Sequence, residues 1–546
     1  MTIVCSLSPP VNPPIRTPKD IDEAIAHLTT CIVTAANIRS YTKNNRTYKN
    51  ALPPEIVEEI ASKNRLRREW QHSRDPLIKR RLYKKIKFIH LILKTHRADE
   101  WDHFLDSLDA QDGLIYKLNK KLLNKTPATP ATHLLIGPNG LTYKDEEKAE
   151  LFADTYEQQF KSSTGPDMPE VTDLIYSIRT SRSSNCYTSP GIVQPIVNKI
   201  SIRKAPGANS ITNTAIKLLP RKIVLLLTHI LNGCLRIGHF PTSWKYATVI
   251  TIPKPGKDHR HPANYRPTAL LSSLSKIFER VILAKLNAAI GPKIRNEQFA
   301  FRPQHSTTHQ LVKLFDQLTT NSNSKLRTAA VFLDVEKAFN RVWHAGLLYK
   351  LHALGTPISL LNIINSFLSE RNFSVRINSS TSNSRSVQSG ISQGSCLSPT
   401  LYVAYTNDVP LNQNARFYLF ADDTLFSTTN KNPKRAAIQL QKRLDITLDW
   451  CNKWRLIINA QKTVAVMFNG PANFATHHLK INGHKIPWFP SSNPISTTTK
   501  INLLQLYVKP ILSYAGSAWR PLLSEANWLK LKAVQNIGLR TTTTSP

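Results

Sequence analysis

The segment from Phe417 to Phe426 sets two adjacent aspartates, Asp422 and Asp423, between two short apolar runs. Both runs are rich in the aromatic and aliphatic residues that favour β-strands. The segment therefore predicts a β-hairpin that carries the two carboxylates at its tip. Because consecutive aspartates are also common in ordinary turns, this pattern alone does not establish a chemical site.

A third carboxylate follows a second predicted strand. Residues 329–333 are small or apolar, and Asp334 comes directly after them. If this strand lies beside the hairpin, Asp334, Asp422 and Asp423 meet at one edge of a sheet. Clusters of oxygen ligands hold hard divalent cations, Mg²⁺ above all. Two such ions can activate a 3′-hydroxyl and stabilise a leaving pyrophosphate.

The chain is strongly basic. Its 72 Lys and Arg residues outnumber 36 Asp and Glu residues, which gives a formal net charge of +36. An excess of this size indicates a polyanionic partner, most simply nucleic acid, with an acidic membrane surface as the alternative. No apolar run approaches the ~18–20 residues of a membrane span, and the N-terminus lacks the features of a secretion signal. The six cysteines form no C-x-x-C pair, so we expect an intracellular protein with reduced thiols and no zinc module.

The basic residues are concentrated near the N-terminus. Residues 60–97 contain 13 Lys and Arg residues against Glu69 and Asp75. Asp75-Pro76 has the pattern of a helix N-cap and first turn, so two helices are predicted. We expect them to bind nucleic-acid phosphates, although a solvated helix face or, around residues 79–85, a nuclear import signal fits the same pattern. The candidate contacts are Arg65, Arg67, Arg68, Lys79, Arg80, Arg81, Lys84 and Lys85.

The rest of the chain alternates predicted strands and helices. The predicted strands span residues 247–252, 329–333 and 464–468, and the predicted helices span 272–290, 346–354 and a segment opened by Asn432-Pro433. The expected fold class is α+β. We expect a basic, mostly helical N-terminal extension over residues 1–164, loose over residues 1–50, and three further parts at 165–328, 329–480 and 481–546.

A loop rich in small residues separates the two carboxylate segments. It runs from Ser389 to Pro399 and contains Ser392-Gln393-Gly394. Small residues let a backbone approach a nucleotide or template base closely. Ser398 as N-cap and Pro399 as first-turn residue would begin a helix directly behind the loop. Taken alone, a plain connecting loop is the simpler interpretation.

The order and spacing of these segments resemble the reverse transcriptase family, and more closely the polymerases of jockey-type non-LTR retrotransposons. The Asp334 strand resembles motif A, the Ser-Gln-Gly loop resembles motif B, and Phe420-Ala421-Asp422-Asp423 resembles motif C. Further segments with family resemblance are Leu456–Thr463 (motif D), Lys204–Gly207, Ile252–Lys257, Asn264–Pro267, Gln298–Arg302 and His305–Thr307. The resemblance runs from about residue 50 to 540. It implies a right-hand polymerase with fingers and early palm at 165–328, a catalytic palm at 329–480 and a shortened thumb at 481–546.

The resemblance also implies roles for individual residues. Asp334, Asp422 and Asp423 would bind two Mg²⁺ ions, with Mn²⁺ as an alternative. Phe339 would exclude a ribose 2′-hydroxyl; the other interpretation is a core phenylalanine. Lys462 would protonate the pyrophosphate leaving group as a general acid, and its alternative is an ordinary surface lysine.

Four more residues would contact the nucleotide. Gln393 and Gly394 would line the incoming nucleotide and the template. Arg266 and Lys254 would contact the triphosphate, which suits a forked guanidinium and a point charge. For Lys254 the alternative is a simple solvated loop lysine.

Several positions depart from the family pattern. Asn340 stands where the family usually has aspartate, Asn209-Ser210 replaces Asp-Gly, and Ala300 replaces glycine. Residues 487–500 are a short, polar, Pro-rich bridge where the family has a primer-grip strand, so we expect part of the thumb to be missing. We also expect no endonuclease, because residues 1–50 are too few to form one.

The resemblance implies an RNA-directed DNA polymerase, a nucleotidyltransferase that extends a DNA 3′ end with dNTPs on an RNA template. The alternative is a catalytically inert, nucleic-acid-binding remnant of such an element. The expected partners are the RNA template, a DNA primer or target and dNTPs, without a membrane. The expected location is the nucleus, the cytoplasm or both, as a ribonucleoprotein.

Overall fold

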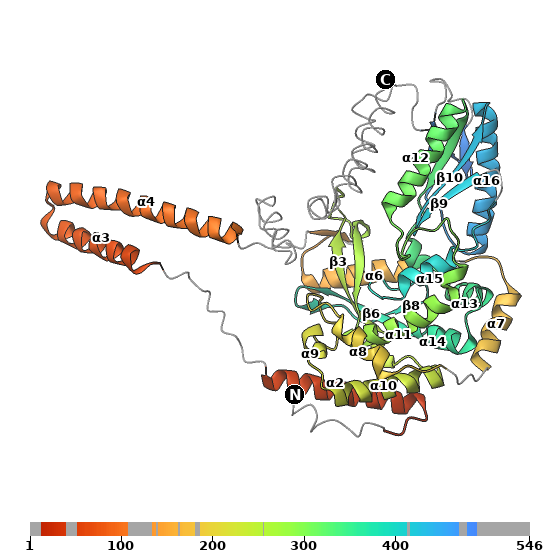
Figure 1. The fold of residues 1–546 in the computed structure, drawn as a ribbon, viewed down its shortest axis with the longest axis horizontal. Coiled ribbons are helices and arrows are strands. Elements are labelled where there is room, and N and C mark those ends of the chain that lie inside the picture. The colour runs from red at the N-terminus through yellow and green to blue at the C-terminus, as the bar shows by residue number, and fades with distance from the viewer. Residues whose placement is uncertain are drawn as a thin grey trace. The chain divides into compact units, whose positions relative to one another are not determined.

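The computed structural model describes residues 13–39, 52–106, 134–137, 140–161, 164–180, 186–254, 256–411, 415–468 and 478–488. These residues fall into two compact units (Figure 1). The smaller unit lies within residues 40–131, and the larger unit contains the rest of the chain. Within the described part, no helix is long and apolar enough to cross a membrane.

The described residues of the smaller unit form a pair of helices, as the sequence predicts. Its helices are α3 (Pro54–Ser73) and α4 (Pro76–Asp106). Arg74 ends α3 in the left-handed conformation, with φ of 54°. The Asp75 carboxylate then accepts a hydrogen bond of 2.7 Å from the backbone N–H of Leu77 and caps α4. Leu82 and Ile89 of α4 are buried, and Lys85 forms an ion pair with Glu59 that joins the two helices.

The larger unit mixes helices and strands, so the predicted α+β class is confirmed (Figure 1). Its helices are α2 (Pro18–Arg39), α6 (Asp145–Gln159), α7 (Pro169–Thr180), α8 (Pro190–Asn198), α9 (Asn213–Lys217), α10 (Arg221–Ile237), α11 (Ser273–Ile290), α12 (Thr307–Asn323), α13 (His344–Ala353), α14 (Ile358–Leu368), α15 (Ser398–Tyr405) and α16 (Pro433–Lys453). Its short 3₁₀ helices are η2 (Thr242–Trp244), η3 (Pro262–Asn264), η4 (Gly291–Lys293) and η5 (Ala338–Arg341).

Two larger sheets organise this unit. The first is antiparallel, with strand order β11-β5-β10-β9, and consists of β5 (Arg327–Leu333), β9 (Ala415–Phe420), β10 (Asp423–Asn430) and β11 (Val464–Phe468). The second is mixed and consists of β3 (Tyr246–Pro253), β4 (Tyr265–Leu270), β6 (Arg371–Ile377), β7 (Ser380–Thr381) and β8 (Arg385–Val387). The two-stranded pairs are β1 (Leu135–Gly137) with β2 (Gly140–Thr142) and β12 (Leu479–Ile481) with β13 (His484–Ile486).

The alternation of side chains along β9 and β10 explains the packing of the first sheet. Phe417 pairs with Phe426 across the hairpin, and both join the core cluster that contains α16. Tyr418 pairs with Leu425, and both pack on Leu314 of α12. Because neighbouring side chains of a strand point to opposite faces, α16 and α12 cover opposite faces of the sheet (Figure 1).

A buried lysine links the helices α13, α15 and α16. Lys350 of α13 donates hydrogen bonds of 2.6 Å to the Tyr405 carbonyl and to the Asp408 carboxylate. Its ammonium also lies 4.3 Å from the ring centroid of Trp450 and 3.9 Å from that of Trp454. Burial lowers the pKa of Lys350 to about 7, against the opposing effect of Asp408. The aromatic rings and the carboxylate together stabilise this charge in the core.

The N-terminal predictions need correction. Residues 18–39, expected to be loose, form α2, because Ile21, Ile25 and Leu28 recur at helical spacing and are fully buried against the larger unit. A single extension over residues 1–164 is also wrong. Residues 13–39 and 134–161 belong to the larger unit, whereas α3 and α4 belong to the smaller one.

The other predicted elements appear close to their expected positions. The strands predicted at 247–252, 329–333 and 464–468 are β3, β5 and β11, and the three predicted helices are α11, α13 and α16. Ser398 is the first residue of α15 and not its N-cap, which is Leu397. The predicted thumb falls largely on residues 489–546, outside the described part of the chain.

The cap of α4 can be tested directly. Replacing Asp75 by Ala removes the acceptor of the Leu77 N–H, and loss of such a cap costs about 1 kcal/mol. We expect amide hydrogen exchange in residues 77–80 to accelerate about five-fold. Asp99→Ala, an exposed change within the same helix, is the control and should leave that exchange unchanged. Equal exchange in both variants would show that Asp75 does not cap α4.

Candidate catalytic site

The strand register brings the three predicted carboxylates to one end of the first sheet. β5 and β10 pair antiparallel, with Leu333 opposite Thr424. One step further, the same register sets Asp334 opposite Asp423. Asp422 precedes Asp423 in the turn between β9 and β10. The predicted convergence of Asp334 with the hairpin tip is therefore seen in the structure.

The surroundings of Asp422 and Asp423 raise the pKa values of both carboxylates. Asp422 and Asp423 have exposed side chains, yet the protein around them partly excludes water. This desolvation raises the pKa of both, and the neighbouring aspartates raise it further. The Arg266 guanidinium acts in the opposite direction on the pKa of Asp422. The tip of the sheet thus concentrates negative charge that a cation would stabilise.

Lys462 lies at the third carboxylate. Its ammonium is 3.4 Å from Asp334 Oδ2. The Asn459 side chain accepts hydrogen bonds from the backbone N–H groups of Gln461 and Lys462 and so shapes the loop that presents this lysine. The Asn459 N–H donates to the Asp334 carbonyl at 2.8 Å. The segment that carries Lys462 is therefore fixed to the end of β5.

Further cations lie around the carboxylates. Desolvation lowers the pKa of Lys254, and Lys462, Arg266 and Lys337 lower it further, which places these four side chains within electrostatic range of one another. Lys254 Nζ also donates to the Ala263 carbonyl at 2.8 Å. Lys337, which sequence reasoning missed, precedes η5 in the left-handed conformation with φ of 50°. Such a group of cations beside carboxylates suits a polyphosphate.

The donor set fits a hard divalent cation, because it consists of carboxylate oxygens whose mutual repulsion a cation relieves. Among the described residues, no three His, Cys, Asp or Glu side chains converge as a ready-made metal cage. The Asp334 carboxylate instead faces Lys462. Metal binding by Asp334, Asp422 and Asp423 therefore stays a prediction, and it requires the Asp334 side chain to exchange its lysine partner for the metal.

The Ser-Gln-Gly loop is held by a buried carboxylate that sequence reasoning missed. Glu279 of α11 is fully buried. Its Oε2 accepts hydrogen bonds from Ser395 Oγ at 2.6 Å and from the Cys396 N–H at 2.7 Å. Gly394 has φ of +149°, and a Cβ there would lie 2.2 Å from the Ala269 carbonyl oxygen. The loop therefore needs glycine at this position and packs directly on β4.

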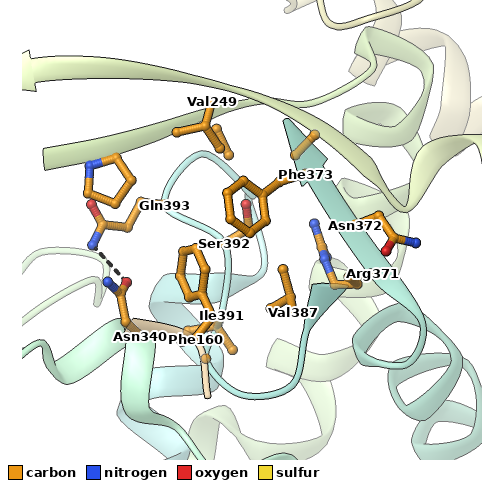
Figure 2. A pocket seen from close by; sticks show the side chains of 14 residues that line it. Phe160, Val249, Asn340, Arg371, Asn372, Phe373, Val387, Ile391, Ser392 and Gln393 are labelled. Carbon is orange, nitrogen blue, oxygen red and sulfur yellow. Dashed lines mark hydrogen bonds between the residues drawn. The ribbon is translucent and has the colours of Figure 1, made fainter. Parts of the chain in front are cut away.

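Gln393 is exposed and is oriented by a neighbouring amide. Its Nε2 donates to Asn340 Oδ1 at 3.3 Å, and Asn340 Nδ2 donates to Gln159 at 3.3 Å. Figure 2 shows this contact at the edge of a pocket that is lined mainly by apolar side chains, with Arg371 beside them. The pocket lies between the second sheet and residues 390–393, and the three aspartates do not line it. Asn340 thus supports Gln393 with its amide.

Phe339 is half-buried in η5, and it has both a contact with the core and an exposed surface. Its ring stacks on Tyr402 of α15, with centroids 4.8 Å apart and planes 11° apart. This contact ties Phe339 to the core, while the ring keeps part of its surface exposed. A role in sugar selection stays a prediction.

The predicted nucleic-acid contacts lie on α3 and α4. Seven of these eight side chains are exposed, and Lys85 is half-buried in its ion pair with Glu59. Lys79 also lies 5.7 Å from the ring centroid of Trp70. The exposed seven are free of such an ion pair among the described residues, whereas Lys85 has a structural role.

Comparison with known proteins agrees with this geometry. Residues 252–504 match the family described as "Reverse transcriptase (RNA-dependent DNA polymerase)". This part of the chain is therefore similar to reverse transcriptases. It contains the carboxylates, the Ser-Gln-Gly loop and the surrounding cations.

Several curated relatives are polymerases of mobile elements. The chain is 31% identical to the "RNA-directed DNA polymerase from mobile element jockey" of Drosophila funebris, over 95% of this chain and 63% of the relative. It is 32% identical to the jockey polymerase of Drosophila melanogaster and to that species' "Probable RNA-directed DNA polymerase from transposon X-element", each over 84% of this chain and 52% of the relative. The chain thus spans between about half and two thirds of these relatives. The predicted jockey-type resemblance is confirmed.

The charge at the sheet tip predicts a stability effect. Because the pKa values of Asp422 and Asp423 are raised above the unfolded value of 3.8, their ionisation opposes folding. This loss of folding free energy is absent at pH values below the pKa of the unfolded state and present at pH values above the pKa of the folded state. We expect Asp422→Asn and Asp423→Asn to raise the melting temperature by a few degrees at pH 7 without divalent cations, and to have little effect at about pH 3. Asp449→Asn, an exposed change on α16, is the control, and equal melting of all variants at pH 7 would contradict the assignment.

Proposed function

We propose that this chain is an RNA-directed DNA polymerase that extends a DNA 3′ end with dNTPs on an RNA template. The observation that carries the proposal is the β5–β10 register, which sets Asp334 beside Asp422 and Asp423 within residues that match the reverse transcriptase family. The names of the jockey-type relatives support the same activity. Such a polymerase would act as a ribonucleoprotein in the nucleus, the cytoplasm or both.

In the proposed mechanism, Asp334, Asp422 and Asp423 would hold two Mg²⁺ ions, or Mn²⁺ in their place. When bound, such ions activate the attacking 3′-hydroxyl and stabilise the leaving pyrophosphate. Asp422 and Asp423 are exposed and Asp334 is half-buried at the open end of the sheet, so a primer terminus can reach them. The family's right-hand arrangement, with the first sheet as palm and the second sheet as part of the fingers, is the architecture that we propose.

The cations would bind the triphosphate. Arg266 lies on β4, and Lys254 directly follows the neighbouring strand β3. Lys337 and Lys462 lie on the side of β5. The Lys462 ammonium, which pairs with Asp334 here, would donate a proton to the pyrophosphate oxygen as the P–O bond breaks. Gln393 and Gly394 would line the nucleotide, and Phe339 would lie next to its sugar.

The decisive experiment is Mg²⁺-dependent extension of a DNA primer annealed to RNA, with Asp422→Asn as the paired variant. We expect extension by the parent chain and a loss of about a thousandfold or more in the variant, because metal-ion stabilisation of a transition state supplies several kcal/mol. Since the same change should raise the melting temperature, this loss could not come from unfolding. RNA binding without extension by the parent chain would reject the proposal and favour a nucleic-acid-binding protein without polymerase activity.

The helices α3 and α4 would bind the RNA template. We expect Arg80, Arg81 and Lys84, all changed to Ala, to weaken RNA binding and to lower the slope of log affinity against log salt by about 2, since each phosphate contact on single strands contributes about 0.7. Changing Lys199, Lys217 and Lys480 to Ala removes the same charge from exposed positions in the larger unit, and it should leave the slope unchanged. Equal slopes for the two triple variants would show that α4 does not contact the RNA.

A further inference from the structure

A short segment before α12 lies beside the hairpin that carries Asp422. Gln298 forms a parallel bridge with Leu419 of β9. The Phe299 N–H donates to the Leu419 carbonyl at 3.0 Å, and the Leu419 N–H donates to the Glu297 carbonyl at 3.1 Å. Residues 297–299 therefore extend the edge of the first sheet next to the turn between β9 and β10.

The Gln298 side chain reaches into that turn. It is buried, with 2% of its surface exposed. Its Oε1 accepts a hydrogen bond of 3.0 Å from the Ala300 N–H and a second of 3.2 Å from the Ala421 N–H. A side-chain amide oxygen has two lone pairs, so this single atom serves both backbone groups. The amide oxygen thus joins the edge segment to the residue directly before Asp422.

Ala421 has a conformation that needs support. Its φ is +58°, in the left-handed region that residues with a Cβ rarely adopt. The residue is buried, so its backbone N–H cannot rely on solvent for a partner. Gln298 Oε1 accepts this hydrogen bond only while Ala421 keeps its position in the turn. It therefore favours the left-handed turn over relaxed alternatives.

We propose that Gln298 is a positioning residue, whose amide oxygen holds the Ala421 N–H and thereby sets the direction in which Asp422 leaves the hairpin. The part of this inference that concerns activity rests on the proposed polymerase function. Gln298 is not among the residues that we propose to contact the nucleotide or a metal ion. Gln298 would affect the reaction indirectly, through the backbone of the turn. That backbone sets the position of Asp422 relative to Asp334 and Asp423.

The test compares an isosteric change with a matched control. Gln298→Met keeps the length of the side chain but removes the acceptor. Gln310→Met is the control, because Gln310 is also buried and donates to the Glu297 carbonyl at 3.2 Å without contacting Ala421. We expect hydrogen exchange in residues 417–426 to accelerate at least tenfold in Gln298→Met and to stay unchanged in Gln310→Met. Equal acceleration in both variants, or none in either, would overturn the proposal.

Activity gives a second, independent readout. We expect Gln298→Met to lower kcat for primer extension at least tenfold with little change in the KM for dNTP, because the bound nucleotide keeps its own contacts. Gln298→Glu retains an oxygen acceptor and should keep at least threefold more activity than Gln298→Met. If the Met variant does not fold, exchange in the Glu variant decides: a protected turn supports the proposal, and an exposed turn overturns it.

A double variant tests the role of the left-handed turn itself. Glycine adopts positive φ readily, so Ala421→Gly should make the turn less dependent on Gln298. We expect the loss of kcat from Gln298→Met to be at least threefold smaller in the Ala421→Gly background, and equal losses in both backgrounds would overturn the mechanism. If the parent chain does not extend a primer, the polymerase proposal fails, while the exchange experiment still decides whether Gln298 holds the turn.

Discussion

The candidate site depends on the antiparallel pairing of β5 with β10. Asp334 and Asp423 come from distant parts of the sequence, and the hydrogen-bonded ladder that sets Leu333 opposite Thr424 brings them together. A shift of one residue in this register would move every side chain of a strand to the other face. Here the register is fixed because Phe426 and Leu425 must pack on opposite faces, towards α16 and α12 respectively. The buried faces of the sheet thus determine the arrangement of the carboxylates at its open end.

That arrangement has an electrostatic cost, which the surrounding residues reduce. Mutual repulsion and desolvation raise the pKa values of Asp422 and Asp423. Lys462 offsets the charge of Asp334 through its ion pair, and Arg266 acts on Asp422. Desolvation and the nearby charges of Lys462 and Arg266 lower the pKa of Lys254, so a bound anion would stabilise its charged form. The site therefore contains two groups of like charge, and a nucleotide with its divalent cations would stabilise both.

Local sequence patterns predict the strands and helices that carry the site. They do not predict the long-range contacts that hold these elements in place. The hairpin, the Asp334 strand and the capped start of α4 follow from strand alternation and turn chemistry within a few residues. By contrast, nothing around Glu279 or Gln298 indicates that their side chains accept hydrogen bonds from Cys396 and Ala421. These partners lie more than one hundred residues away. The burial of α2 was missed for the same reason, since its partner α10 lies far along the chain.

The contacts of the Ser-Gln-Gly loop also show that the structure supporting this loop extends beyond the residues with the family match. The Ser389 N–H and Oγ both donate to the carbonyl of Phe160, directly after α6, at 2.9 and 3.0 Å. Gln159 of α6 accepts from Asn340, which in turn accepts from Gln393. Residues 140–161 therefore support the loop from a position upstream of the matched range. A chain that began at residue 252 would leave Asn340 and Ser389 without these partners, so α6 is part of the structural unit that orients Gln393.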